Sequence, residues 1–125
     1  TSAMCKEVDF CGVRSGRDID KLEKCGFHAV PAREVSAPII EECPVSLECR
    51  IIEEKPLGTH TMFLAEIVGI DVDERYIDSK GKLNLQQCGL TAYAHGEYFA
   101  LGRKLGDFGF SVRKKNKKRP PKKQG

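Results

Sequence analysis

Hydrophobic and polar residues alternate one by one through VSLECRI, in the middle of the chain. The apolar positions fall on one face and the polar positions on the other: Val45, Leu47, Cys49 and Ile51 against Ser46, Glu48 and Arg50. A period of two is typical of a half-buried strand. The next run, TMFLAEIVGIDV, is apolar on both faces near its start, which predicts cover on both sides of that end. Joined by the turn residues KPLGTH, residues 44–55 and 60–73 predict an antiparallel hairpin.

Two short helices are expected before this hairpin. Residues 2–10 place apolar side chains at helical spacing, and Gly12 is expected to end that helix. A second helix is expected from about Gly16 to Lys24, with Gly26 as its C-terminal stop. The apolar stripes are Ala3, Met4, Val8 and Cys11 in the first helix, and Ile19, Leu22 and Cys25 in the second.

The remaining segments add little to a core. Residues 28–43 predict a proline-containing connection, and residues 85–95 predict one further short strand. A two-stranded ribbon is not stable on its own, so the doubly apolar strand needs neighbours that these elements do not supply. Either a partner chain or the rest of a longer protein is expected to cover it.

Composition is that of one globular domain, with 125 residues, 40% hydrophobic and 31% charged. No apolar run reaches the roughly 18 residues of a membrane-spanning helix, and the N-terminus lacks a secretory pattern. Six cysteines occur without a C-x-x-C pair, so no metal site is predicted. We expect reduced thiols in a cytoplasmic protein rather than a secreted disulfide framework.

The net charge of +3 comes from the C-terminal end. Residues 113–125 carry eight Lys or Arg and no acidic residue, whereas residues 1–112 carry thirteen basic and eighteen acidic residues. Residues 1–112 are therefore expected to form the domain and residues 113–125 a disordered basic tail. Such a tail either binds nucleic acid nonspecifically or only solubilises the protein. We prefer the second interpretation because no aromatic residue interleaves the charges to stack on bases.

The segment CGVRSGRDIDK, residues 11–21, carries the candidate chemistry. Ser15 and Asp18 fit a capping-box-like pattern at the start of the second predicted helix. Capping does not explain Arg17 and Lys21, which are expected about one helical turn apart. Free N–H groups and two cations at a helix start suit an anion, but from the spacing alone solvated charges on an exposed helix face are the preferred interpretation.

Four sequence blocks occur in a characteristic order: CGVRSGRDIDKLEKCGF, APIIEECPVSLECRI, LGTHTMFLAEIVGIDVDERYID and AYAHGEYFALGRKLGDFGFSV. Together they resemble the flavin reductase-like family, which includes the flavoredoxins, over residues 1 to about 113. The resemblance implies a mainly β fold with flanking helices, an FMN-binding split β-barrel. In that family an N-terminal half with a Thr/Ser-rich phosphate loop precedes this region. The barrel is therefore expected to be incomplete here, because its N-terminal strands are missing.

The resemblance also implies site residues. Those expected to bind the flavin are Ser15, Gly16, Arg17, Lys21, His60 and Tyr93. Lys21 is expected near the isoalloxazine, where a cation stabilises the anionic reduced ring. His60 is the candidate catalytic residue, on the flavin side or the nicotinamide side; without the resemblance it is a structural histidine. Without the resemblance, Tyr93 is interpreted as an aromatic residue of the core.

Two activities are consistent with the resemblance. The first is an NAD(P)H-dependent flavin reductase that passes hydride to FMN and electrons onward. The second is an FMN-binding electron-transfer module without NAD(P)H oxidation, or an inactive fragment. The chain has no G-x-G-x-x-G fingerprint, but the family uses NAD(P)H without one. A homodimer is expected, together with a redox partner protein and no membrane association.

Overall fold

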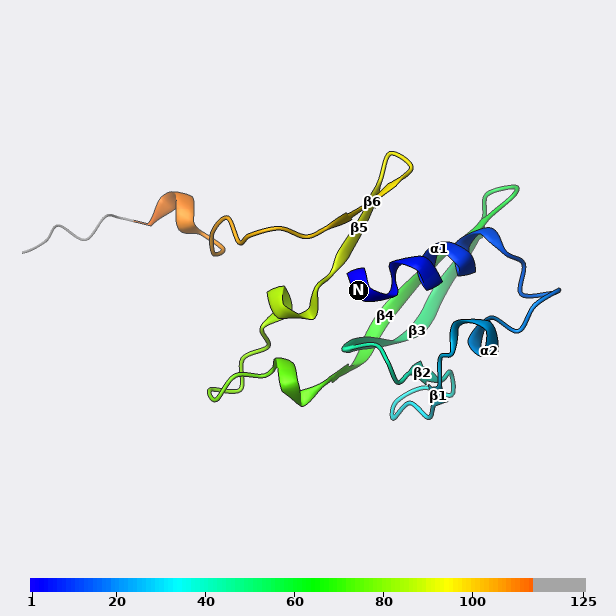
Figure 1. Ribbon diagram of the computed structural model, residues 1–125, viewed down its shortest axis with the longest axis horizontal. Coiled ribbons are helices and arrows are strands. Elements are labelled where there is room, and N and C mark those ends of the chain that lie inside the picture. The colour runs from blue at the N-terminus through cyan, green and yellow to red at the C-terminus, as the bar shows by residue number, and fades with distance from the viewer. Residues whose placement is uncertain (114–125) are drawn as a thin grey trace, which may run out of the picture.

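A computed structural model describes residues 1–113 of the chain (Figure 1). Its helices and strands, in chain order, are α1 (Cys5–Val13), α2 (Lys21–Cys25), β1 (Ala29–Val30), β2 (Ile39–Ile40), β3 (Val45–Pro56), β4 (Thr61–Val72), β5 (Thr91–Ala94) and β6 (Glu97–Ala100). Short 3₁₀ turns add η1 (Ser2–Met4), η2 (Glu74–Tyr76), η3 (Leu85–Cys88) and η4 (Phe110–Val112). The strands of this part of the chain form three separate two-stranded ribbons. The prediction of a mainly β fold with flanking helices is confirmed.

The long β3–β4 ribbon is the predicted hairpin. Val45 pairs with Val72 at its base and Pro56 with Thr61 at its tip, and the pairing is antiparallel throughout. The register slips between Glu48 and Cys49 and again between Ile51 and Glu53. Irregularities of this kind increase the local twist of a ribbon, and they change which residues share a face.

The β5–β6 hairpin was only partly predicted. Its first strand lies in the expected range, whereas residues 85–88 form the turn η3 instead of strand. The second strand, β6, follows a two-residue turn at His95 and Gly96, whose φ angles are 51° and 81°. Two left-handed residues are what a tight hairpin turn requires, so His-Gly was an available signal for it.

The first helix packs against this hairpin. Tyr98 donates a hydrogen bond from its hydroxyl to Asp9 Oδ1 over 3.2 Å, and Ser2 N donates to Gly89 O over 2.7 Å. Gly12 does not end the helix as predicted but lies inside it, because α1 continues to Val13. Within the connection over residues 28–43, the ribbon β1–β2 forms where no strand was expected.

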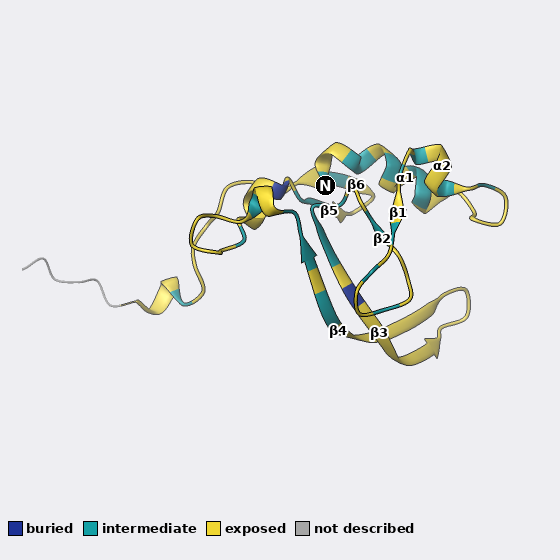
Figure 2. Cartoon of the chain, turned by 90° about the horizontal axis from the view of Figure 1, so that it is seen from below, coloured by how far each residue is buried: buried dark blue, intermediate teal, exposed yellow. Residues whose placement is uncertain are grey.

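Very little of the described chain is buried. Only Cys88 and Glu48, within residues 1–113, are buried, at 4% and 1% exposure (Figure 2). Leu47 and Ile51 were predicted to face the core, but they are 53% and 52% exposed. At Glu48 it is the opposite face of β3, predicted to be exposed, that is buried. The segment before β2 covers the polar face instead. The apolar start of β4 likewise lies open to solvent, not covered on both sides.

Within residues 1–113, no helix has the length and apolar character that crossing a bilayer demands. Of the predicted basic tail, only Arg113 is described, and its Nη1 lies 3.7 Å from Asp107 Oδ2. The rest of that segment, residues 114–125, lies outside the described residues.

Candidate functional site

The segment predicted to start a helix at Gly16 forms a turn instead. Ser15 Oγ accepts a hydrogen bond from Arg17 N over 3.2 Å, and Asp18 N donates to Ser15 O over 3.3 Å. The bond between Ser15 and Arg17 is the one that a serine N-cap makes, but it belongs to a turn over residues 16–18 that does not continue into a helix. The prediction that Ser15 caps the helix is therefore wrong, and Arg17 does not lie on the helix.

Helix α2 begins at Lys21, with Asp20 as its N-cap. Asp20 Oδ1 accepts a hydrogen bond from Glu23 N over 3.1 Å. The D-x-x-E spacing of Asp20 and Glu23 fits the same capping pattern that was assigned to Ser15 and Asp18. Gly26 ends the helix in a left-handed conformation with φ 66°, as predicted.

The turn and the start of α2 surround an open hollow lined by residues 16–22. Its cations are Arg17 and Lys21, and its carboxylates are Asp18 and Asp20. A Cβ built on Gly16 would meet only Lys21 Cε, at 3.8 Å, so the backbone there is open to a ligand. The hollow offers an open peptide backbone and two cations, and the Ser15 hydroxyl lies directly before it in the chain, which together is donor chemistry for an oxyanion.

Lys21 also has a structural contact. Its Nζ donates a hydrogen bond to the carbonyl oxygen of Cys11, near the end of α1, over 2.5 Å. This bond links the two helices and fixes the position of the ammonium group. It uses one of the three N–H donors of the ammonium, so two remain for a ligand.

His60 lies at the tip of the β3–β4 hairpin. Leu57 N donates to His60 O over 2.8 Å, which closes the turn, and Thr59 Oγ1 and His60 Nδ1 share a hydrogen bond of 2.8 Å. The His60 side chain is exposed. The start of β4, which follows His60, was expected to be buried but is also exposed. Its Nε2 side is free of the Thr59 contact, and a ring in this position can donate or accept at that nitrogen.

Tyr93 is paired with Tyr98 across the β5–β6 hairpin. Their ring centroids lie 4.9 Å apart at an interplanar angle of 57°. A small hollow beside them is completed by Thr1, Cys5 and Val8 of the N-terminal segment. Burial, followed by the nearby Asp9 carboxylate, raises the pKa of the Tyr98 hydroxyl. Tyr98 was not predicted as a partner of Tyr93, although the two tyrosines stand at equal distances from a two-residue turn, which makes them cross-strand partners.

The predicted site residues occupy three separate places in the described chain. Ser15, Gly16, Arg17 and Lys21 lie together around the α1–α2 connection. His60 lies at the tip of the β3–β4 hairpin and Tyr93 on the β5–β6 hairpin, and neither lines the hollow at residues 16–22. The grouping of all six into one flavin site stays a prediction.

Glu48 is the one charged residue that is buried within residues 1–113, at 1% exposure. Its carboxylate accepts three consecutive backbone N–H bonds: from Arg33 over 3.1 Å, Glu34 over 2.6 Å and Val35 over 3.1 Å. Burial alone raises the pKa of a carboxyl group, but here the backbone donors outweigh it and the pKa of Glu48 is lowered. Gly69 faces it across the ribbon, where a Cβ would lie 3.3 Å from the Glu48 side chain.

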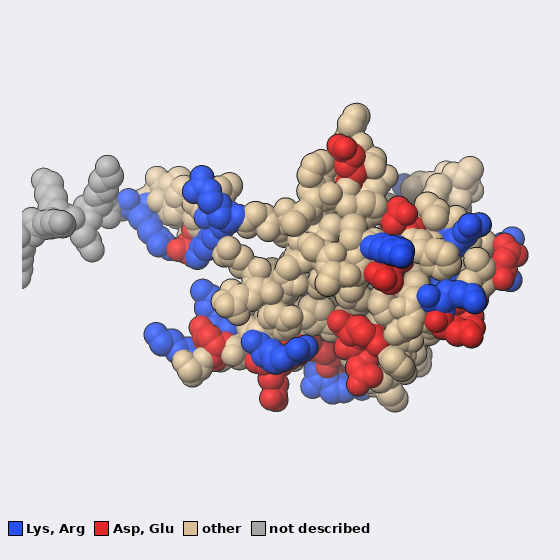
Figure 3. Space-filling view, in the orientation of Figure 1, with Lys and Arg blue, Asp and Glu red and all other residues tan. Residues whose placement is uncertain are grey.

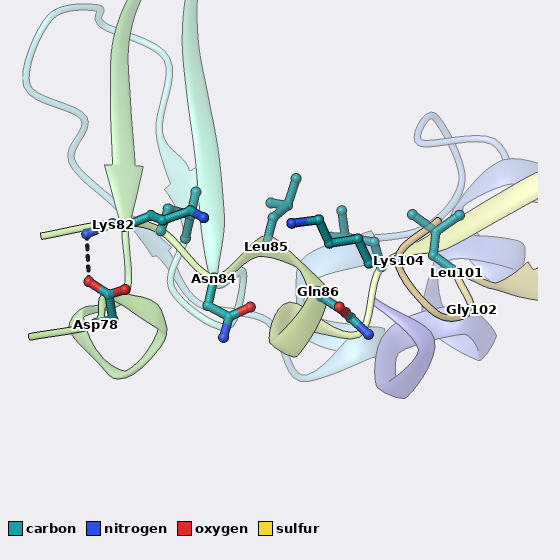
Figure 4. Close-up of a pocket in the computed structure, with 10 residues that line it drawn as sticks. Asp78, Lys82, Asn84, Leu85, Gln86, Leu101, Gly102 and Lys104 are labelled. Atoms are coloured by element: carbon teal, nitrogen blue, oxygen red, sulfur yellow. Dashed lines mark hydrogen bonds between the residues drawn. The ribbon is translucent and has the colours of Figure 1, made fainter. Parts of the chain in front are cut away.

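Another cavity lies elsewhere, between residues 78–90 and residues 101–104, with a volume of about 400 Å³ (Figure 4). Lys82 and Lys104 extend toward Leu85 there, and Asp78 Oδ1 accepts a hydrogen bond from Lys82 N over 3.0 Å. Lys104 Nζ is paired with Asp107. None of the six predicted site residues lines this cavity.

Charged side chains of both signs mix around the helical end of the molecule, while the middle of the same face is mostly uncharged (Figure 3). The hollow at residues 16–22 follows this pattern, because its two cations are balanced by two carboxylates. Its attraction for an anion therefore depends on local hydrogen bonding rather than on a large positive field.

Comparisons with known proteins agree on one family. The model of the flavin reductase like domain matches residues 4–102. An uncharacterized protein of Archaeoglobus fulgidus is 34% identical over 84 residues, which are 67% of this chain and 48% of that protein. The flavoredoxin of Desulfovibrio vulgaris (Miyazaki F) is 28% identical with a TM-score of 0.79, over 89% of this chain and 60% of that one.

A Shewanella frigidimarina protein described as having a split barrel domain matches with a TM-score of 0.66 at 22% identity, over 84% of this chain and 54% of that one. The fold is thus a split-barrel fold, of which the described residues form open ribbons. The chain spans about half to three-fifths of the length of these relatives. With 99 consecutive positions matched by the family model, the chain belongs to the flavin reductase-like family.

Proposed function

We propose that the protein containing this chain binds FMN and is an oxidoreductase of the flavin reductase type, taking hydride from NAD(P)H and passing electrons onward. The observation that carries this proposal is the family match over residues 4–102. The flavoredoxin and split-barrel structures support it through their fold. The activity belongs to the whole protein, since the relatives are longer than this chain.

The residues at the α1–α2 connection fit one wall of a flavin site. Ser15 would donate a hydroxyl hydrogen bond and Arg17 a forked pair of N–H groups to phosphate oxygens. Lys21, held by the Cys11 carbonyl, would place a positive charge beside the ring. FMN, when bound, supplies the redox centre, because its ring accepts a hydride equivalent. His60 and Tyr93 would have to approach this wall from other elements, or from a second copy.

A second copy is part of the same proposal. The β3–β4 ribbon exposes apolar side chains that a monomer would leave in water: Ile51, Ile52, Met62, Phe63, Leu64 and Ile67. Exposed apolar surface of this extent is typical of an interaction surface. We propose a homodimer in which polypeptide of both copies covers the ribbon, with a separate redox partner protein and no membrane.

One observation favours the second activity, an FMN-binding electron-transfer module without NAD(P)H oxidation. The solved structure with 28% identity and a TM-score of 0.79 is named a flavoredoxin. The two activities differ only in whether the purified protein oxidises NAD(P)H.

The test uses the protein at its full natural length, titrated with FMN by flavin fluorescence. Wild type should bind FMN, and Arg17→Ala should weaken binding about tenfold through the lost charge-assisted bonds. Arg14→Ala, just outside the hollow, is the matched control and should bind like wild type.

Loss of reduced nicotinamide absorbance after mixing with NADH or NADPH then separates the two activities. Bleaching of bound FMN by either donor supports the reductase. Bleaching only by a chemical reductant supports the electron-transfer module. No FMN binding by wild type contradicts both, and equal effects of the two arginine variants contradict the proposed wall.

A further inference from the structure

Two cysteine sulfurs meet between the first two helices. Cys11 Sγ and Cys25 Sγ lie 3.6 Å apart and share a hydrogen bond in partly buried surroundings. Both residues are free thiols, each at intermediate exposure. In the part of the chain that the structure describes, no other two sulfurs are hydrogen-bonded to each other.

Ordered backbone holds each sulfur in place. Cys11 lies within α1, and Cys25 is the last residue of α2, directly before the left-handed Gly26. Phe27 N donates to Leu22 O over 2.9 Å, which fixes the end of α2. The Lys21 bond to the Cys11 carbonyl, one helical turn before Cys25, joins the two helices at the same place.

The contact is close to what a disulfide needs. The two sulfurs must approach by about 1.5 Å to reach a disulfide bond length of roughly 2.05 Å. A metal site is the other chemistry that two thiols suggest. Among residues 1–113, however, no three His, Cys, Asp or Glu side chains gather to hold a metal ion.

We propose that Cys11 and Cys25 form a reversible dithiol–disulfide site that a peroxide oxidises. One thiol loses its proton and the thiolate attacks a peroxide oxygen; the O–O bond breaks, the leaving hydroxide takes up a proton, and a sulfenic acid and water form. The second thiol attacks the sulfenic sulfur, the S–S bond forms and a second water leaves. Two thiols are oxidised, one hydrogen peroxide is reduced, and two waters are produced.

Burial, followed by the hydrogen bond with Cys11, raises the pKa of the Cys25 thiol, which keeps it protonated and slow to react. Once formed, the bond closes a loop over residues 11–25 that contains the whole hollow at residues 16–22. The proposed disulfide site does not depend on flavin binding, so a negative result for either proposal leaves the other unaffected.

The test treats the reduced full chain with hydrogen peroxide, blocks remaining thiols and digests with trypsin without reduction. The tryptic peptides of the two cysteines are residues 7–14 and 25–33, and neither contains another cysteine. Their disulfide-linked pair should be the main cross-linked product by mass spectrometry, and thiol reductant should release both peptides. Cys5→Ser should leave the product unchanged, while Cys11→Ser should abolish it.

The same reaction in denaturant shows whether the fold selects the pair. Random closure favours short loops, so Cys5–Cys11 and Cys43–Cys49, each six residues apart, should dominate there. A Cys11–Cys25 product that is dominant only without denaturant supports the proposal. The same product distribution in both conditions, or thiols that all remain reduced at a peroxide excess that oxidises the denatured chain, would overturn it.

Discussion

Glu48 acts as an anchor for the segment that precedes β2. A carboxylate out of contact with water loses its hydration, and three backbone N–H groups replace that hydration here. Those N–H groups belong to residues 33–35, which form no strand or helix of their own. The strand β3 therefore orders a neighbouring loop through one side chain, and Gly69 opposite leaves the room for it.

Glu48→Gln should release this loop. The neutral amide has one acceptor oxygen in place of two, so amide exchange at Arg33, Glu34 and Val35 should become about ten- to hundredfold faster. Glu53→Gln, on the exposed part of the same strand, is the matched control and should leave these rates unchanged. Equal exchange in both variants, measured by NMR, would contradict the anchor.

The anchor should also depend on pH, and the sign follows from the lowered pKa of Glu48. A depressed pKa stabilises the fold above the ordinary value of 4.5, and this stabilisation is lost as the pH falls through the folded-state pKa. The loop should therefore lose order in acid in wild type. It should show no such additional acid transition in Glu48→Gln.

At the scale of elements, the start of α2 is decided by a competition between two capping patterns. Ser15 and Asp18 fit one, and Asp20 and Glu23 fit the other. The first does not start a helix: Ser15 makes the bond to Arg17 N that an N-cap makes, but the turn does not continue, and glycine at position 16 is costly in a helix. The helix is only five residues long, so its stability depends on tertiary contacts such as the Lys21 hydrogen bond to the Cys11 carbonyl of α1.

Asp20→Ala and Asp18→Ala test this assignment. Removing the N-cap should lower the free energy of unfolding by about 1 kcal/mol, whereas Asp18→Ala should change it by less than about 0.5 kcal/mol. Denaturant unfolding of the two variants under identical conditions gives both values. A larger loss in Asp18→Ala would restore the helix start expected from Ser15.

For the whole molecule, the exposed β3–β4 ribbon is the dominant feature. Large apolar side chains cover it, while buried side chains are nearly absent from residues 1–113. A small domain needs a buried core to offset the entropy of ordering its chain. The ribbon is therefore expected to be stable only where further polypeptide packs on it.

Phe63→Lys should weaken the proposed homodimer, because a lysine cannot replace the buried ring. Loss of a Phe contact of this size corresponds to a rise of about ten- to hundredfold in the dimer dissociation constant, measured by sedimentation. Leu105→Lys, at a still more exposed apolar position far from the ribbon in sequence, should leave the constant unchanged. A wild-type protein that stays monomeric at every concentration would contradict the dimer.

The sequence by itself determined the local pattern of this protein. Alternation over residues 44–73 predicted the long hairpin, Gly26 marked the end of α2, and four ordered motifs indicated the family. These features depend on residues close together in the chain, where periodicity and backbone preference are decisive. The same signals placed Ser15, Gly16, Arg17 and Lys21 in one region, where the structure also has them.

Only the tertiary structure decided which face of a strand is buried and which distant groups meet. Alternation assigned Glu48 to solvent, yet a loop from another part of the chain covers that face and its N–H groups hold the carboxylate. The contact between Cys11 and Cys25 likewise depends on how two helices cross. Such contacts are settled by packing and by which polypeptide covers a surface, and neither is written in the spacing of residues along one segment.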